Sequence, residues 1–281
     1  MLETRLRKAR AEKDILLMTH IVVGYPSIQA SLEIVDAMVE AGVDLMELQI
    51  PFSEPMADGP VILAANQKAL AGGTTVERCF DFAAKVAKKH PIPFLFMTYY
   101  NLLFRAGVTT FVERMKRAGL TGAIVPDLPP EEAADYLGAM NDAGLDPIFI
   151  FSPGTPDERM RAIAAQGRGF IYCVARKGVT GVHTSFSAEI DAYLARSRAA
   201  TTLPLALGFG VQDATDVNFL RGKVDIAVVG SATLRLIDDK GVGAVGGSLC
   251  GSWLMKWLPE NVLRGFIVLV GAVLTVWMFV R

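Results

Sequence analysis

The most constraining feature of the sequence is an alternation, up to about residue 237, between short apolar runs and longer segments of helical periodicity. The apolar runs are Leu16–Val23, Asp44–Ile50, Pro93–Thr98, Gly122–Pro126, Pro147–Phe151, Gly169–Val174, Leu203–Leu207 and Asp225–Val229. Because each run is apolar at successive positions rather than at every second one, the runs predict parallel strands buried on both faces.

Helical segments separate these runs. They include Ile28–Ala41, Val76–Lys89, Thr109–Ala118, Pro130–Ala143 and Asp157–Gln166. Gly42, Gly119 and Gly144 each follow a helical segment and lead into the next run, where a left-handed cap is expected. Eight such units in about 220 residues predict a (β/α)8 TIM barrel, placed at residues 1–237. A doubly wound open sheet is the main alternative, but no glycine-rich phosphate loop follows the first run.

Composition narrows the class of protein. Of 281 residues, 52% are hydrophobic, and 28 basic against 29 acidic side chains give a net charge of −1. A nucleic-acid-binding protein usually has a basic excess, so we expect no such partner. Cys79, Cys173 and Cys250 lie far apart and form no metal-binding spacing. The charged N-terminus has no apolar signal-peptide core behind it, and we expect the barrel to be cytoplasmic.

Two carboxylates follow the second run. Strand alternation predicts that Glu47 points into the barrel, where burial would raise its pKa toward a value useful in proton transfer. The stiff loop PFSEPMADGP after it carries Asp58, and two carboxylates in one pocket are a common acid–base arrangement. The structural alternatives are a Glu47 paired with a lysine or arginine, and an Asp58 that only caps the next helix.

Glycine-rich turns follow the seventh and eighth runs, where barrels often bind phosphate. One turn contains Gly208 and Gly210, and the other contains Gly230 and Ser231 at the start of a short helix. Two ordinary glycine turns are the alternative. The segment RKGVTGVH after the sixth run is typical of a mobile lid over a phosphorylated ligand, and Tyr172 in that run is a candidate for the pocket wall.

Taken together, these motifs resemble the tryptophan synthase alpha-chain family from about Leu16 to Leu236. The segments that carry the resemblance are MELQIPFSEPMADGP, YNL at 100–102, VPDLPPEE, PIFIFSPGTPDER, GVTG, LGFGV and VVGSA. The resemblance implies a lyase that splits indole-3-glycerol phosphate into indole and glyceraldehyde 3-phosphate by retro-aldol cleavage, with no metal or organic cofactor. It also implies a heterotetramer with two pyridoxal-phosphate-dependent beta chains, contacted near residues 53–58 and Asp127.

The resemblance assigns a role to each matching residue. Glu47 corresponds to the catalytic glutamate, and Asp58 to the aspartate that holds the indole N–H. The implied substrate-binding residues are Tyr172 beside the glutamate, Thr180 and Gly181 in the lid, Phe209 as an indole-contacting wall, and Gly210, Gly230 and Ser231 around the phosphate.

Tyr25, Gln49 and Glu54 depart from common family residues, but none of them is a proposed catalytic group. Tyr25 and Glu54 bear on partner contacts more than on the chemistry. Two other functions stay open on sequence grounds. They are a non-catalytic ligand-binding subunit that regulates a beta chain, and another phosphate-binding barrel isomerase.

The tail at 238–281 is atypical. Residues 265–280 contain no charge, and an apolar helix at about 262–280 would approach the thickness of a ~30 Å hydrocarbon core. The tail weakly resembles the last segment of sulfite-exporter-type permeases. We expect a membrane-spanning helix and hence membrane contact; the alternative is a divergent eighth helix docked on the barrel.

Overall fold

The computed structural model describes residues 1–174, 188–208 and 214–243. Eight strands pair in parallel and in chain order, and β8 pairs with β1, so that the sheet closes into a barrel. The strands are β1 Leu16–Val22, β2 Leu45–Gln49, β3 Phe94–Met97, β4 Gly122–Ile124, β5 Asp146–Phe151, β6 Ile171–Val174, β7 Leu205–Gly208 and β8 Ile226–Val229. The predicted (β/α)8 barrel is confirmed, and each strand overlaps one of the eight apolar runs.

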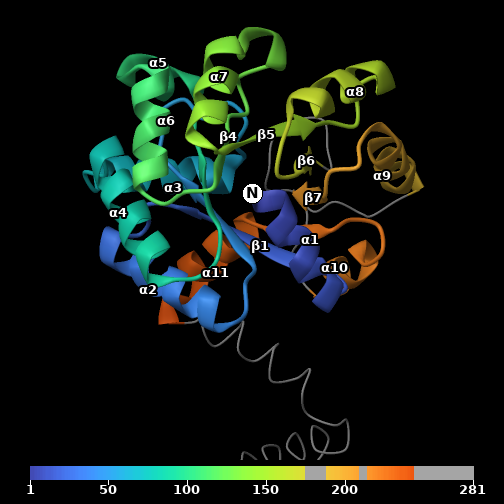
Figure 1. Ribbon diagram of the computed structural model, residues 1–281. Helices are drawn as coiled ribbons and strands as arrows, with labels where there is room; N and C mark the ends of the chain where they lie inside the picture. The colour runs from blue at the N-terminus through green and yellow to red at the C-terminus, as the bar shows by residue number, and fades with distance from the viewer. Residues whose placement is uncertain (175–187, 209–213, 244–281) are drawn as a thin grey trace, which may run out of the picture.

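Helices cover the outside and one end of the barrel (Figure 1). They are α1 Leu2–Glu12, α2 Ile28–Glu40, α3 Pro60–Ala71, α4 Val76–Lys89, α5 Tyr100–Ala106, α6 Val108–Arg117, the 3-10 turn η1 Pro130–Glu132, α7 Ala134–Ala143, α8 Asp157–Gln166, α9 Ala188–Ala200, α10 Ala214–Leu220 and α11 Ser231–Lys240. Gly42, Gly119 and Gly144 have positive φ angles, as the predicted caps require.

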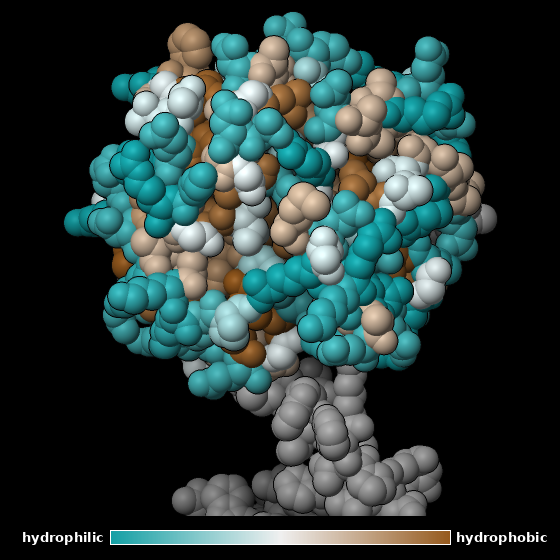
Figure 2. All heavy atoms as spheres, viewed as in Figure 1, coloured by the Kyte–Doolittle hydropathy of each residue, from teal (hydrophilic) through white to brown (hydrophobic). Residues whose placement is uncertain are grey.

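The core has two apolar layers. The outer layer packs the strands against the helices, and the inner layer fills the barrel. Leu2 and Leu6 of α1 belong to the inner layer, so α1 closes one end of the barrel, and the Leu2 backbone N–H donates to Asp146 at the start of β5. The opposite end, where the strands terminate at their carboxyl ends, is therefore the open end. The face seen in Figure 2 is largely hydrophilic, with apolar side chains visible mainly between helices.

The helix after β8 is present and packed. Helix α11 contacts α3 and β1, and its Asp238 accepts hydrogen bonds from the hydroxyl of Tyr25 and, at 3.1 Å, from the amine of Lys68. The barrel therefore closes with α11 in place. Within the described residues, no helix is long and apolar enough to cross a membrane. The apolar helix expected at about 262–280 lies outside those residues.

Candidate active site

Glu47 lies at the centre of the candidate site, on β2. It is 4% exposed and points into the barrel, because Leu45, two residues earlier, belongs to the inner apolar layer. Its Oε1 lies 2.8 Å from Nδ1 of His20, the residue paired with it in the β1–β2 register. The partner is therefore a histidine, and not the lysine or arginine of the structural alternative. Oε2 of Glu47 is buried and has no hydrogen-bond partner among the described residues.

Asp58 lies at the end of the loop that follows β2. The N-cap of α3 is Gly59, so Asp58 stands one residue before the cap rather than at it. Its Oδ2 accepts a hydrogen bond of 2.5 Å from the side-chain amide of Gln49, and the Tyr99 hydroxyl also hydrogen-bonds this carboxyl group. Burial raises the pKa of Asp58 above its usual range, and the hydrogen bonds from Gln49 and Tyr99 offset only part of that effect.

Neighbouring side chains hold the loop that carries Asp58. The Ala57 backbone N–H donates to the Tyr99 hydroxyl at 3.2 Å, and the Phe52 ring stacks on Tyr99 with centroids 5.1 Å apart. Asn66 of α3 accepts from the Phe52 N–H at 2.9 Å. The three prolines of PFSEPMADGP limit the backbone further. The loop is thus fixed at both ends.

Tyr172 lies on β6 and faces both carboxylates. Burial, followed by the charges of Glu47 and Asp58, raises its pKa well above the usual value, so the phenol keeps its proton. A β-carbon at Gly208 would lie 2.3 Å from the Tyr172 hydroxyl oxygen. Gly208 is therefore needed to leave room for this ring. The approach of an anion to the Gly208 backbone stays a prediction.

The turn after β8 is the described part of the predicted phosphate cradle. Gly230 is the N-cap of α11 and Ser231 its first residue, as expected. The turn is next to β1, because a β-carbon at Gly230 would lie 3.5 Å from Cβ of His20. Helix N-termini favour phosphate. The other expected contacts, Thr180, Gly181, Phe209 and Gly210, lie outside the described residues.

Two residues of this pocket were not identified from the sequence. His20 has no partner at metal-ligand spacing in the sequence, and Gln49 was noted only as a departure from the family. Both lie on the inward-facing side of adjacent strands, with His20 level with Glu47 and Gln49 two residues beyond it. The sequence did contain a signal for His20. It is two residues from Met18 and four from Leu16, so it faces the inside of the barrel as they do, and it lies two residues before the end of β1.

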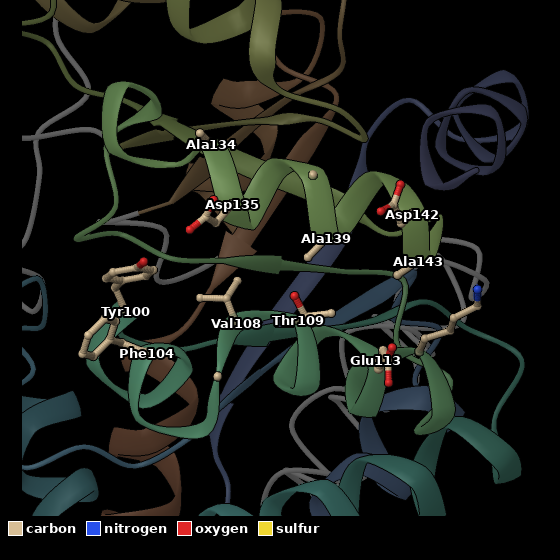
Figure 3. Close-up of a pocket in the computed structure, with 13 residues that line it drawn as sticks. Tyr100, Phe104, Val108, Thr109, Glu113, Ala134, Asp135, Ala139, Asp142 and Ala143 are labelled. Atoms are coloured by element: carbon tan, nitrogen blue, oxygen red, sulfur yellow. The ribbon is translucent and has the colours of Figure 1, made fainter.

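A hollow of about 710 Å³ lies outside the barrel between α5, α6 and α7 (Figure 3). Tyr100 and Phe104 are at one end, and Asp142 and Ala143 are near the other. None of the predicted site residues lines it. Within the described chain, no group of three or more His, Cys, Asp or Glu side chains is placed to hold a metal ion.

The model of the family described as tryptophan synthase alpha chain matches residues 6–245. This match covers most of the chain and runs past both ends of the segment from Leu16 to Leu236. The chain belongs to the tryptophan synthase alpha-chain family. It is therefore a lyase of tryptophan biosynthesis that cleaves indole-3-glycerol phosphate.

Individual tryptophan synthase alpha chains and solved structures agree with this membership. The alpha chain of Syntrophotalea carbinolica is 66% identical over 245 residues, which cover 87% of this chain and 97% of the relative. The alpha chain of Desulforapulum autotrophicum is 64% identical over 246 residues, which cover 88% and 97%. A structure of Mycobacterium tuberculosis tryptophan synthase superposes with a TM-score of 0.82 at 32% identity, covering 89% of this chain and 96% of that one.

Proposed function

We propose that Glu47 is the acid and base of the cleavage and that Asp58 holds the indole N–H. The observation that supports this most is the convergence of both carboxylates, with Tyr172, inside the open end of the barrel. Barrel enzymes carry their chemistry at this end. Family membership decides against another barrel isomerase, and the retention of both carboxylates argues against a purely regulatory subunit.

The reaction requires two proton transfers. A protonated Glu47 gives its proton to C3 of the indole ring, which makes the ring a leaving group with positive charge at its nitrogen. Asp58 accepts the indole N–H and stabilises that charge. As the C–C bond breaks, the Glu47 carboxylate takes the proton of the C3′ hydroxyl, which becomes the aldehyde of glyceraldehyde 3-phosphate. Glu47 thus ends in the protonation state in which it began.

The remaining contacts bind the substrate. The N-terminus of α11, with Gly230 and Ser231, is suited to the phosphate group. Tyr172 lines the pocket beside Glu47 as a neutral phenol. Thr180 and Gly181 of the lid, Phe209 against the indole, and Gly210 at the phosphate complete the proposed substrate-binding set.

Glu47→Gln tests the proposal through steady-state indole release from indole-3-glycerol phosphate. Glutamine keeps the size of the side chain but cannot carry the proton, so kcat is expected to fall about 10²- to 10⁴-fold. Glu54→Gln is the matched control, because Glu54 is exposed in the loop that follows the same strand. Equal rates in wild type and Glu47→Gln would reject the assignment.

We also propose that the chain pairs with a tryptophan synthase beta chain in an α2β2 assembly. A solved Pyrococcus furiosus tryptophan synthase complex, with 30% identity and a TM-score of 0.77, supports this pairing. Met56 and Phe104 are 76% and 70% exposed, and both follow strand ends on the open side of the barrel. Large exposed apolar side chains on one side of a protein favour a protein interface.

Phe104→Asp tests the partner surface. Asp127 accepts hydrogen bonds from the Tyr100 N–H at 2.9 and 3.1 Å and so anchors the helix that presents Phe104. Titration of a purified beta chain is expected to show at least about tenfold weaker binding, because a carboxylate would be desolvated in the interface. Leu70→Asp on α3 is the control. Unchanged affinity in Phe104→Asp would place the interface elsewhere.

A further inference from the structure

Each of the two proposed catalytic carboxylates contacts another buried polar side chain. His20 lies 2.8 Å from Glu47, and Gln49 donates to Asp58 at 2.5 Å. We propose that His20 is a positioning residue for the lyase reaction, which orients Glu47 and, with Gln49, joins both carboxylates into one polar row. This inference rests on the roles proposed for Glu47 and Asp58.

Strand geometry places the row. His20 and Glu47 are register partners on β1 and β2, and Gln49 is two residues beyond Glu47 on the same inward face. All three side chains are almost completely buried, with exposed fractions of 4%, 4% and 0%. The row therefore crosses the pocket floor without contact with bulk water, where hydrogen bonds and charges act strongly.

The hydrogen-bond donors and acceptors of the four side chains can be matched in one order along the row. Nε2 of His20 and Oε1 of Gln49 are both buried and without a hydrogen-bond partner among the described residues. A protonated imidazole has two N–H donors, one for Glu47 and one for Gln49. The Gln49 amide oxygen accepts while its amide nitrogen donates to Asp58. A proton on Nε2 of His20 would make it a donor to Oε1 of Gln49, so the order Glu47, His20, Gln49, Asp58 would give each of these two atoms a partner.

The surroundings of His20 favour its protonated form. Burial alone lowers the pKa of His20, but the charge and hydrogen bond of Glu47, with contributions from Asp58 and Gln49, leave it raised. Among the described residues, the titratable groups that face the row are these two carboxylates, Tyr172 on β6 and Tyr99, which hydrogen-bonds Asp58. With Oε1 of Glu47 held by His20, Oε2 is left for the substrate. The indole C3 and the C3′ hydroxyl would then meet a fixed carboxylate oxygen.

His20→Phe and His20→Asn separate positioning from packing. Phenylalanine removes the donor to Glu47, so kcat for indole release is expected to fall about 10- to 100-fold while KM stays within about twofold. Asparagine restores a neutral donor, so it recovers most of the kcat. It cannot supply the positive charge that lowers the pKa of Asp58, so the acidic limb of the kcat/KM profile, where Asp58 becomes protonated, moves to higher pH. His90→Asn is the matched control, because His90 contacts Asp36 outside the barrel.

The comparison with Glu47→Gln separates this inference from the proposed function. An active Glu47→Gln enzyme would reject the catalytic assignment itself. An inactive Glu47→Gln enzyme, together with wild-type kcat and pH profile in His20→Phe, would overturn only the role of His20. If His20→Phe does not fold, the kcat/KM profile of His20→Asn tests the proposal instead. An acidic limb at the same pH as in wild type would overturn it.

Discussion

Gly208 and Tyr172 fit together: a β-carbon at Gly208 would lie 2.3 Å from the hydroxyl oxygen of Tyr172 and 2.5 Å from Cε1 of its ring. The two residues are on paired strands, β7 and β6, inside the barrel. The position of the Tyr172 ring therefore depends on Gly208 having no side chain.

Gly208→Ala is expected to displace the Tyr172 ring and to lower the free energy of unfolding by about 1–3 kcal/mol, because overpacking forces side chains from their preferred rotamers. Urea unfolding measures the loss, and the KM for indole-3-glycerol phosphate should rise with it. Gly138→Ala is the control. Gly138 is exposed in α7 with nothing within 4 Å of an added β-carbon, so alanine should stabilise the helix by up to about 1 kcal/mol. Equal effects of the two substitutions would contradict the packing argument.

Tyr25→Phe is expected to destabilise the barrel by about 1 kcal/mol, the typical contribution of one hydrogen bond. The Tyr25 hydroxyl donates to Asp238 of α11 and accepts from Lys68 of α3 at 3.3 Å, so it links three segments. Guanidinium unfolding of Tyr25→Phe, Asp238→Asn and the double variant measures the coupling. If the two single losses simply add, the link between Tyr25 and Asp238 contributes nothing.

Asp146→Asn tests the closed end of the barrel through pH. Burial raises the pKa of Asp146 above its usual range, and the hydrogen bond from the Leu2 N–H offsets only part of this. The folded state therefore binds the proton more readily than the unfolded chain, so stability falls as pH rises from about 3.9 through the raised pKa. Above that pH range the buried negative charge destabilises the folded state by a constant amount. Asparagine removes this charge, and its side-chain oxygen still accepts the hydrogen bond from the Leu2 N–H.

The melting temperature of Asp146→Asn at pH 7.5 should equal or exceed that of wild type, and the advantage should shrink as the pH is lowered toward 4. Asp142→Asn, at an exposed position of α7, serves as the reference. An advantage that grows on acidification would show that the sign of the Asp146 shift is wrong.

The fold could be predicted from the sequence because the signals for strands and helix ends are local. Runs such as Pro147–Phe151 are apolar throughout, and β5 covers that run at Asp146–Phe151. Glycines such as Gly144 end helices through their own backbone freedom, with a φ of 71°. The alternation of side chains along one strand also predicted that Glu47 points into the barrel, since residues two apart share a face.

The partners of these residues could not be predicted, because they depend on register and on distant segments. Recognising His20 beside Glu47 requires knowing which residues of β1 and β2 are level. Tyr25 and Asp238 are 213 residues apart, and their contact exists only once α11 has packed beside α3. Tyr25 was identified as a departure from the family, but its structural role came only from the closed barrel.

The central claim is that Glu47 and Asp58 act together on one bound substrate, and a double-mutant cycle tests it most directly. Single-turnover indole formation would be measured for wild type, Glu47→Gln, Asp58→Asn and the double variant. Residues that act in one step lose their effects non-additively. We expect the double variant to be little slower than the slower single variant. Single losses that multiply in the double variant, or single variants as fast as wild type, would contradict the claim.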